Sequence, residues 1–143
     1  MHNWFQCKVK YERNGEDGSV TKVSEAYLID ALSFTEAEER INEEMKPFIS
    51  GDFLVADIKR ARINELFEHE GGDKWYRCKV YFISLDEEKG VEKRIATTMF
   101  AQASSVKEAV EVLDKGMKGT LADYEIASVT ETNVMDVFKY EAP

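Results

Sequence analysis

The stretch WFQCKV at residues 4–9 returns as WYRCKV at residues 75–80, 71 positions further along the chain. A self-match at a fixed spacing is typical of an internal repeat, in which one structural unit is built twice. The match continues through the elements that follow, so it sets the frame for the whole chain. We predict two tandem repeats, at residues 1–70 and 71–143, that together form one compact globular domain.

The composition is that of a globular protein with an acidic surface. The chain of 143 residues is 43% hydrophobic and 33% charged, and its formal net charge is −9. An overall polyanion is repelled by nucleic-acid phosphates and by anionic lipid surfaces, which disfavours both as partners. The sequence shows no leader pattern and no apolar window of membrane-spanning length. We therefore expect a cytoplasmic protein without a membrane span.

Each repeat opens with a predicted β-hairpin. Residues 5–11 alternate apolar and polar side chains, the period of a strand with one buried face, and Asn-Gly and Asp-Gly turn signals follow at residues 14–18. The return strand spans about residues 21–31. The corresponding segments of the second repeat are residues 76–82, 86–90 and 95–103.

A capping box marks the start of one helix in each repeat. The sequences SFTE at residues 33–36 and SVKE at residues 105–108 place a serine hydroxyl and a glutamate carboxylate where they bond free backbone N–H groups of the first turn. Apolar side chains then recur on one helical face. They are Phe34, Ala37, Ile41 and Met45 in the first repeat and Val106, Ala109, Leu113 and Met117 in the second.

A third strand follows each helix, at about residues 53–63 and 124–134, and a short apolar tail closes each repeat. A right-handed crossover through the helix makes this strand parallel to the second and leaves the first strand in the centre. The predicted fold class is therefore α+β: two tandem ββαβ repeats related by a pseudo-twofold axis, with antiparallel or mixed sheets and one helix per repeat.

The orientation of the third strand bears on function. If Ala56 and Ile58 face the helix, Phe53 and Val55 face away from it, and the equivalent side chains of the second repeat do the same. Apolar groups of this size are rarely left as one exposed patch. We therefore expect this face to be covered by the other repeat or by a partner.

Cys7 and Cys78 occupy equivalent positions in the two repeats. A catalytic thiol needs an activating base, and the chain offers only His2 and His69. No Cys-x-x-Cys or histidine spacing typical of a metal site is present. We expect both cysteines to be buried as small apolar side chains.

Two other segments are rich in functional groups. The connector at residues 68–73 contains carboxylates and an imidazole that could hold a divalent ion, although solvated charges are ordinary in a linker. The sequence KGMKG at residues 115–119 resembles a phosphate loop in composition, but it follows a helix instead of opening one. Helix-ending glycines explain it better. We predict no metal site and no cofactor.

The first strands of the two repeats also present an outward row of aromatic and basic side chains. Single-stranded nucleic-acid platforms use such rows, because bases stack on the rings while the cations follow the phosphates. This row is the candidate ligand or partner surface. It consists of Trp4, Lys8 and Lys10 in the first repeat and Trp75, Arg77 and Lys79 in the second.

Three motifs carry a resemblance to a known family. They are WFxCK at residues 4–8, YLIDALSFTEAE at residues 27–38 and KGMKGTxADY at residues 115–124. Over almost its full length the chain resembles a family of small uncharacterised proteins from Bacteroidota that is catalogued as a domain of unknown function. The resemblance implies a bacterial, or resident phage, cytoplasmic setting and transfers no catalytic or binding residue.

Acidity, a surplus apolar sheet face and the lack of an evident catalytic group favour a non-enzymatic adaptor or regulator that engages a protein partner or a second copy of itself. Single-stranded nucleic-acid binding by the outward row is the alternative. A third class is an enzyme that uses Asp30, Asp57 or Glu65, because paired carboxylates suffice for acid–base chemistry. We do not expect an enzyme, and we predict no catalytic residue.

Overall fold

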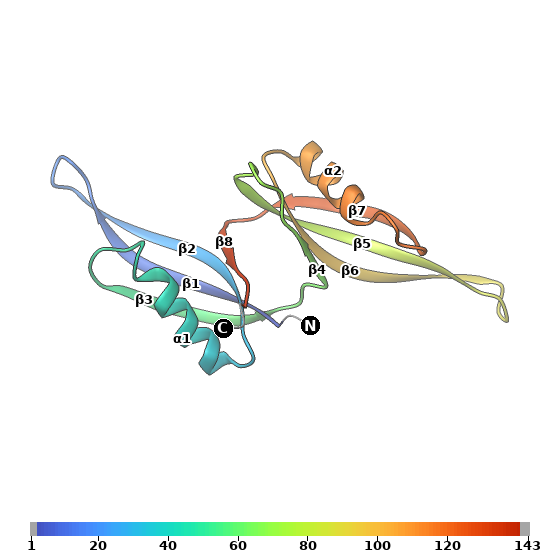
Figure 1. Cartoon of the computed structure of the whole chain (residues 1–143), viewed down its shortest axis with the longest axis horizontal. Helices are drawn as coiled ribbons and strands as arrows, with labels where there is room; N and C mark the ends of the chain where they lie inside the picture. Colours follow the sequence, from blue (N-terminus) through green and yellow to red (C-terminus); the bar gives the residue numbers. More distant parts are fainter. Residues whose placement is uncertain (1–2, 141–143) are drawn as a thin grey trace. The chain divides into compact units, whose positions relative to one another are not determined.

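The computed structural model describes residues 3–140, which form two mixed four-stranded sheets, each with one helix (Figure 1). The α+β class is therefore confirmed. No helix in the described part of the chain is long and apolar enough to cross a membrane. The elements are β1 (Trp4–Asn14), β2 (Val20–Asp30), α1 (Phe34–Met45), β3 (Phe53–Ala61), β4 (Glu65–Phe67), β5 (Lys74–Asp86), β6 (Val91–Ala103), α2 (Val106–Gly116), β7 (Asp123–Glu131) and β8 (Val134–Phe138).

The two sheets have the same internal arrangement. One has the strand order β3-β1-β2-β8 and the other β4-β6-β5-β7. In each, the first strand of a hairpin is central and pairs antiparallel with both of its neighbours, as the sequence predicts. The fourth strand pairs parallel with the second hairpin strand.

The fourth strand of each sheet comes from the other sequence repeat. The short tail of the first repeat is β4, which pairs with β6, and the tail of the second repeat is β8, which pairs with β2. The compact units are accordingly Met1–Arg62 with Asn133–Pro143, and Ile63–Thr132. The sequence predicts that each tail closes its own repeat, whereas in the structure the two tails are exchanged between the sheets.

Chain length explains the exchange. The free position beside β2 lies three strand spacings from β3, about 14 Å. Ala61, the last residue of β3, lies level with Asp30 at the end of β2. Glu65 pairs with Met99 in the other sheet, and the residue of β2 equivalent to Met99 is Tyr27, about 10 Å back along the strand from Asp30. The straight path is about 17 Å, and the four residue steps from Ala61 to Glu65 span at most about 14 Å. The first repeat cannot close its own sheet.

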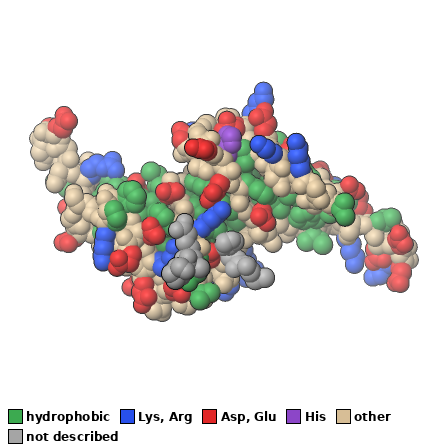
Figure 2. Space-filling model, in the orientation of Figure 1, with side chains coloured by type: hydrophobic (Ala, Val, Ile, Leu, Met, Phe, Trp, Pro, Cys, Tyr) green, Lys and Arg blue, Asp and Glu red, His purple; other side chains and the backbone are tan. Residues whose placement is uncertain are grey.

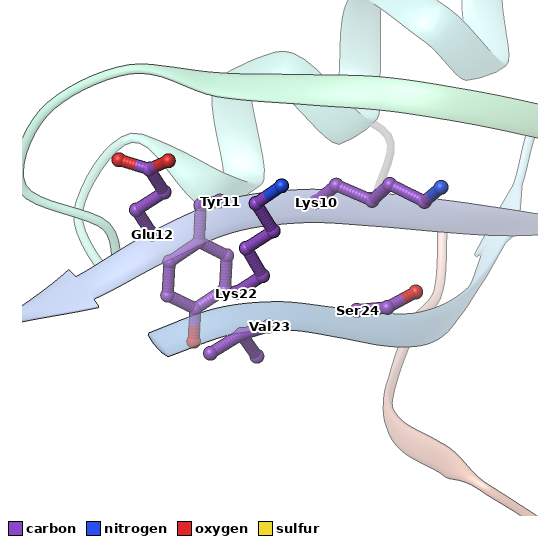
Figure 3. Close-up of a pocket in the computed structure, with 6 residues that line it drawn as sticks. All are labelled: Lys10, Tyr11, Glu12, Lys22, Val23 and Ser24. Carbon is purple, nitrogen blue, oxygen red and sulfur yellow. The ribbon is translucent and has the colours of Figure 1, made fainter. Parts of the chain in front are cut away.

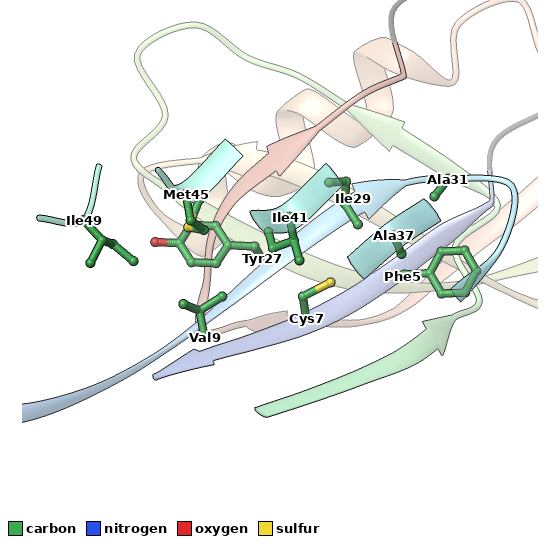
Figure 4. Packing of buried hydrophobic residues seen from close by; sticks show 10 residues of the cluster. All are labelled: Phe5, Cys7, Val9, Tyr27, Ile29, Ala31, Ala37, Ile41, Met45 and Ile49. Atoms are coloured by element: carbon green, nitrogen blue, oxygen red, sulfur yellow. The ribbon is translucent and has the colours of Figure 1, made fainter. Parts of the chain in front are cut away.

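Each helix packs its apolar stripe on one face of its sheet. In the first unit, Ala37, Ile41 and Met45 of α1 point at Phe5, Cys7 and Val9 of β1, together with Tyr27 and Ile29 of β2 and Ala31, which follows that strand (Figure 4). In the second unit, Ala109, Leu113 and Met117 pack against Tyr76, Cys78 and Val80. The stripe residue at each helix start is half-exposed, but the Phe34 ring still meets that of Phe5 edge to face at 4.8 Å.

The structure corrects the predicted orientation of the third strand. A one-residue β-bulge interrupts the pairing of β1 with β3, since Lys8 is opposite Asp57 but Val9 is opposite Val55. The extra residue, Ala56, shifts the alternation, so that Phe53, Val55 and Ile58 all pack against the core under the helix. The same bulge recurs at Ala127, and Tyr124, Ile126 and Val129 also face their helix. The apolar groups expected on the outer face are therefore core residues.

Gly116, at the end of α2, allows β4 to pack closely against this helix. A Cβ atom built at this position would lie 2.5 Å from the ring of Phe67, well inside van der Waals contact. Phe67 packs against the second core, so the glycine lets the exchanged strand approach the helix closely. The phosphate-loop resemblance of this segment thus has a packing explanation.

Both capping boxes are present, so each cap is a testable stabilising contact. Ser33 Oγ accepts the Glu36 N–H at 3.1 Å, and Ser105 Oγ accepts the Glu108 N–H at 3.1 Å. We expect Ser33→Ala and Ser105→Ala each to lower the free energy of unfolding by about 1 kcal/mol, because one N–H donor loses its partner. Urea denaturation measures the change. Ser50→Ala, at an exposed position after α1, is the control and should change little.

The exchanged strand β8 should contribute measurably to stability. Phe138 stacks on Tyr27 with ring centroids 5.9 Å apart, and it packs against the first core. Because the ring is half-buried, we expect Phe138→Ala to lower the free energy of unfolding by about 1–3 kcal/mol. Met135→Ala, on the same strand and 57% exposed, is the control. Equal stability of the two variants would contradict a structural role for β8.

Candidate functional site

Strand β2 has a free edge over half of its length. β8 pairs with β2 only from Ala26 to Ile29, so Val20–Glu25 has no strand neighbour on that side among residues 3–140. At the two ends of the hairpin, the Gly15 N–H bonds the Ser19 carbonyl and the Ala31 N–H bonds the Asn3 carbonyl. Hydrogen-bonded pairs alternate with non-bonded pairs along an antiparallel ladder, so the odd-numbered residues of β2 bond to β1. The even-numbered residues Lys22 and Ser24 therefore direct their backbone N–H and C=O groups to the free edge.

Two hollows lie along this segment and share Ser24. The larger, of about 400 Å³, is lined by Lys10, Tyr11, Glu12, Lys22, Val23 and Ser24 (Figure 3). Figure 3 shows the Tyr11 ring reaching toward Val23 on the neighbouring strand. The smaller, of about 80 Å³, is lined by Gln6, Lys8, Ser24, Glu25, Ala26, Asp57, Lys59 and Asn133. We call the two hollows together the β2 groove.

The β2 groove has two chemically different sides. Tyr11 packs against the helix-covered core, and its register partner Val23 shares that face. Lys10 and Lys22 alternate with them and lie on the opposite face. Interaction with the Glu25 carboxylate, and to a lesser degree burial, raises the pKa of the Tyr11 hydroxyl, so that this ring stays neutral at pH 7.

The lysines of the β2 groove are not paired with acids. Among the described residues, no ion pair involves Lys8, Lys10, Lys22 or Lys59. The β2 groove is also lined by three acids, Glu12, Glu25 and Asp57. Its formal charge is therefore +1, whereas that of the whole chain is −9. Elsewhere on the visible surface, acidic and basic side chains are interspersed (Figure 2).

Beside the equivalent edge of the second unit, side chains contact one another across the sheet face. Arg94, the counterpart of Lys22, forms an ion pair with Glu125 at 2.8 Å and lies over the ring of Tyr81. Lys79, the counterpart of Lys8, also lies over Tyr81, with its Nζ 5.3 Å from the ring centroid. Tyr81 stands where the first unit has Lys10. The two repeats therefore share a fold but differ at this edge.

A family model covers nearly the whole chain. It is described as a domain of unknown function, DUF4494, and it matches residues 3–140. The chain belongs to this family. No curated protein and no solved structure matches it. The match confirms that the chain is a domain of unknown function, as the sequence motifs predict, and it assigns no role to any residue of the site.

The six residues of the surface predicted from the sequence differ in their exposure. Lys8, Lys10, Arg77 and Lys79 are exposed, but Trp4 and Trp75 are only 3% and 4% exposed. A ring that is this buried offers no face on which a base can stack. Lys8 and Lys10 instead belong to the β2 groove. Sequence reasoning missed Tyr11, Lys22 and Lys59, and only their cross-strand register brings them beside the predicted lysines.

The carboxylates considered for catalysis do not gather in one described hollow. Asp30 is buried and accepts the Asn3 N–H at 3.0 Å, Asp57 lines the β2 groove, and Glu65 lies in β4 of the second unit. In the connector, His69 Nε2 lies 3.5 Å from the Glu108 carboxylate. No group of three potential metal ligands occurs among residues 3–140.

The two cysteines are free and fully buried. Desolvation by burial, with a smaller effect of the Asp57 charge, raises the pKa of Cys7 to about 12. Desolvation raises the pKa of Cys78 to about 11. Both thiols are therefore protonated at pH 7, whereas a nucleophilic cysteine needs its thiolate.

This burial predicts the reactivity of the thiols. We expect both to react with a disulfide reagent such as DTNB only when the protein unfolds, and two equivalents should then be released. The unfolded thiols ionise near pH 8.5, below the folded values, so the folded state holds more protons and its stability falls as pH rises between about 9 and 11. Fast reaction of either thiol in the folded protein at pH 8 would contradict this structural role.

Proposed function

We propose that this protein is a non-enzymatic binding protein that takes an extended segment of a protein partner as an added strand along the free edge of β2. The observation that carries the proposal is the coincidence of an unpaired strand edge with an open groove. Backbone groups of Lys22 and Ser24 supply the hydrogen bonds of such a strand, and the hollows beside them accept its side chains.

The two sides of the β2 groove define the kind of segment that fits. Alternate side chains of an added strand point to opposite faces. On the helix side they meet Tyr11 and Val23, which favours apolar residues. On the other side they meet Lys10 and Lys22, which favours acidic residues. The partner segment is therefore extended, with apolar and acidic side chains in alternation.

Two features of the chain support a binding role in the cytoplasm. Lysine on a strand edge is also a common protection against unwanted pairing. Here, however, two lysines that have no ion-pair partner among the described residues line a hollow of about 400 Å³, and two more line the hollow next to it. The unpaired, buried cysteines suit a reducing compartment, in agreement with the cytoplasmic location proposed from the sequence.

A proline at the outward-facing backbone position tests the proposal. Lys22→Pro removes an N–H that points to the free edge and leaves the bonds from β2 to β1 in place. Peptides that are selected from a random displayed library for binding to the wild-type protein should bind Lys22→Pro at least about tenfold more weakly, because a strand hydrogen bond and its geometry are lost. Fluorescence polarisation measures the affinities.

Matched variants separate the edge from the charge. Arg94→Pro makes the same change at the equivalent edge of the second unit and should leave the affinity unchanged. Lys22→Thr keeps the backbone N–H and should lose less affinity than Lys22→Pro. Selected peptides that bind all three variants as tightly as the wild-type protein would overturn strand addition at β2.

A further inference from the structure

The smaller hollow of the β2 groove lies where β8 begins. β8 runs parallel to β2 and pairs with it from Ala26 onward, and Asn133, the residue before β8, lines the hollow. A strand added beside Lys22 and Ser24 lies on the same line as β8. Its path along β2 is closed at Asn133, because the next positions beside β2 are already taken.

The hollow is lined by a small residue beside a long one. Lys8 is the cross-strand partner of Ala26, and both residues line the hollow. Lys59 is the cross-strand partner of Gln6 and lines the same hollow. Lys8 and Lys59, together with Gln6 and Asn133, therefore line a site with one opposing side-chain charge on this face, that of Asp57.

Asp57 does not neutralise Lys8. It is the register partner of Lys8 across β1 and β3, yet no ion pair joins the two side chains among the described residues. The Glu25 carboxylate accepts a hydrogen bond from the Tyr27 hydroxyl, whose ring packs in the core on the opposite face. The ammonium of Lys8 is free to meet a negative charge that enters from the edge.

The direction of the added strand determines whether its amino end or its carboxyl end lies at the smaller hollow. A strand parallel to β2 and β8 brings its carboxyl end to the hollow, and an antiparallel strand brings its amino end. Lys8 and Lys59 repel an ammonium and attract a carboxylate. The added strand lies two strand spacings from β1, about 10 Å, and the flexible four-carbon stem of Lys8 spans most of this distance when it extends across Ala26.

We propose that the β2 groove binds the C-terminal end of a partner chain, parallel to β2, with its terminal α-carboxylate bound by Lys8 over Ala26 and by the amide of Asn133. Lys59 adds a second positive charge. This inference rests on the proposed strand addition, and it specifies that the partner segment ends at the groove instead of passing through it.

The test uses random twelve-residue peptides displayed in two formats, one that ends in a free carboxylate and one whose C-terminus is fused to a carrier. We expect enrichment in the free-carboxylate format. The enriched sequences, synthesised as free acids, should bind at least about tenfold more tightly than their carboxamides, as measured by fluorescence polarisation. Lys8→Gln should reduce this preference to less than about threefold, and Lys79→Gln, the matched variant in the second unit, should leave it unchanged.

The possible failures are distinguishable. Enrichment only in the fused format, or equal affinity of acid and amide, with binding that Lys22→Pro still weakens at least about tenfold, would overturn the carboxylate site and leave strand addition standing. A preference for the acid that Lys8→Gln does not alter would place the carboxylate elsewhere and also overturn this inference. Failure to enrich peptides in either format would overturn both proposals.

Discussion

The fold depends on one constraint, which is that the chain between β3 and β4 is too short to return across its own sheet. Parallel closure beside β2 requires a path of about 17 Å, and the available residues span about 14 Å. The tail of the first repeat therefore enters the sheet that contains β6, and the tail of the second repeat enters the sheet that contains β2. Neither repeat is a closed unit by itself, which gives the duplication a structural reason.

The free strand edge is a consequence of the same arrangement. β2 has 11 residues, whereas the exchanged strand β8 has 5, so the fourth strand covers only the end of β2 nearest the core. The remaining edge keeps its backbone donors and acceptors. Proteins usually protect such edges with charge, bulges or covering segments. In the second unit, Tyr81, Arg94 and Glu125 contact one another on the sheet face beside the corresponding edge, whereas the lysines of the β2 groove have no ion-pair partner among the described residues and line its two hollows.

Sequence duplication thus supplies a comparison within one molecule. Features that occur in both units, such as buried Cys7 and Cys78, the serine caps and the bulges at Ala56 and Ala127, belong to the fold. Features that occur in only one unit are the better candidates for a role in function. The contrast between Lys10 in one unit and Tyr81 in the other is of this second kind, and it supports a single binding edge in a chain with two similar sheets.

The sequence by itself determined the hairpins, the helices with their caps, the central position of β1 and β5 and the buried cysteines, because these follow from local periodicity and from turn and cap chemistry within a few residues. Only the tertiary structure decided where the tails pair, that a bulge turns Val55 inward, that Trp4 is buried, that Lys22 lies near Lys10 and that Lys59 lies near Lys8. The physical reason is that backbone hydrogen bonding is nearly independent of side-chain identity. The partner of an edge strand, and the register that aligns side chains across strands, is set by chain length and by packing over the whole sheet.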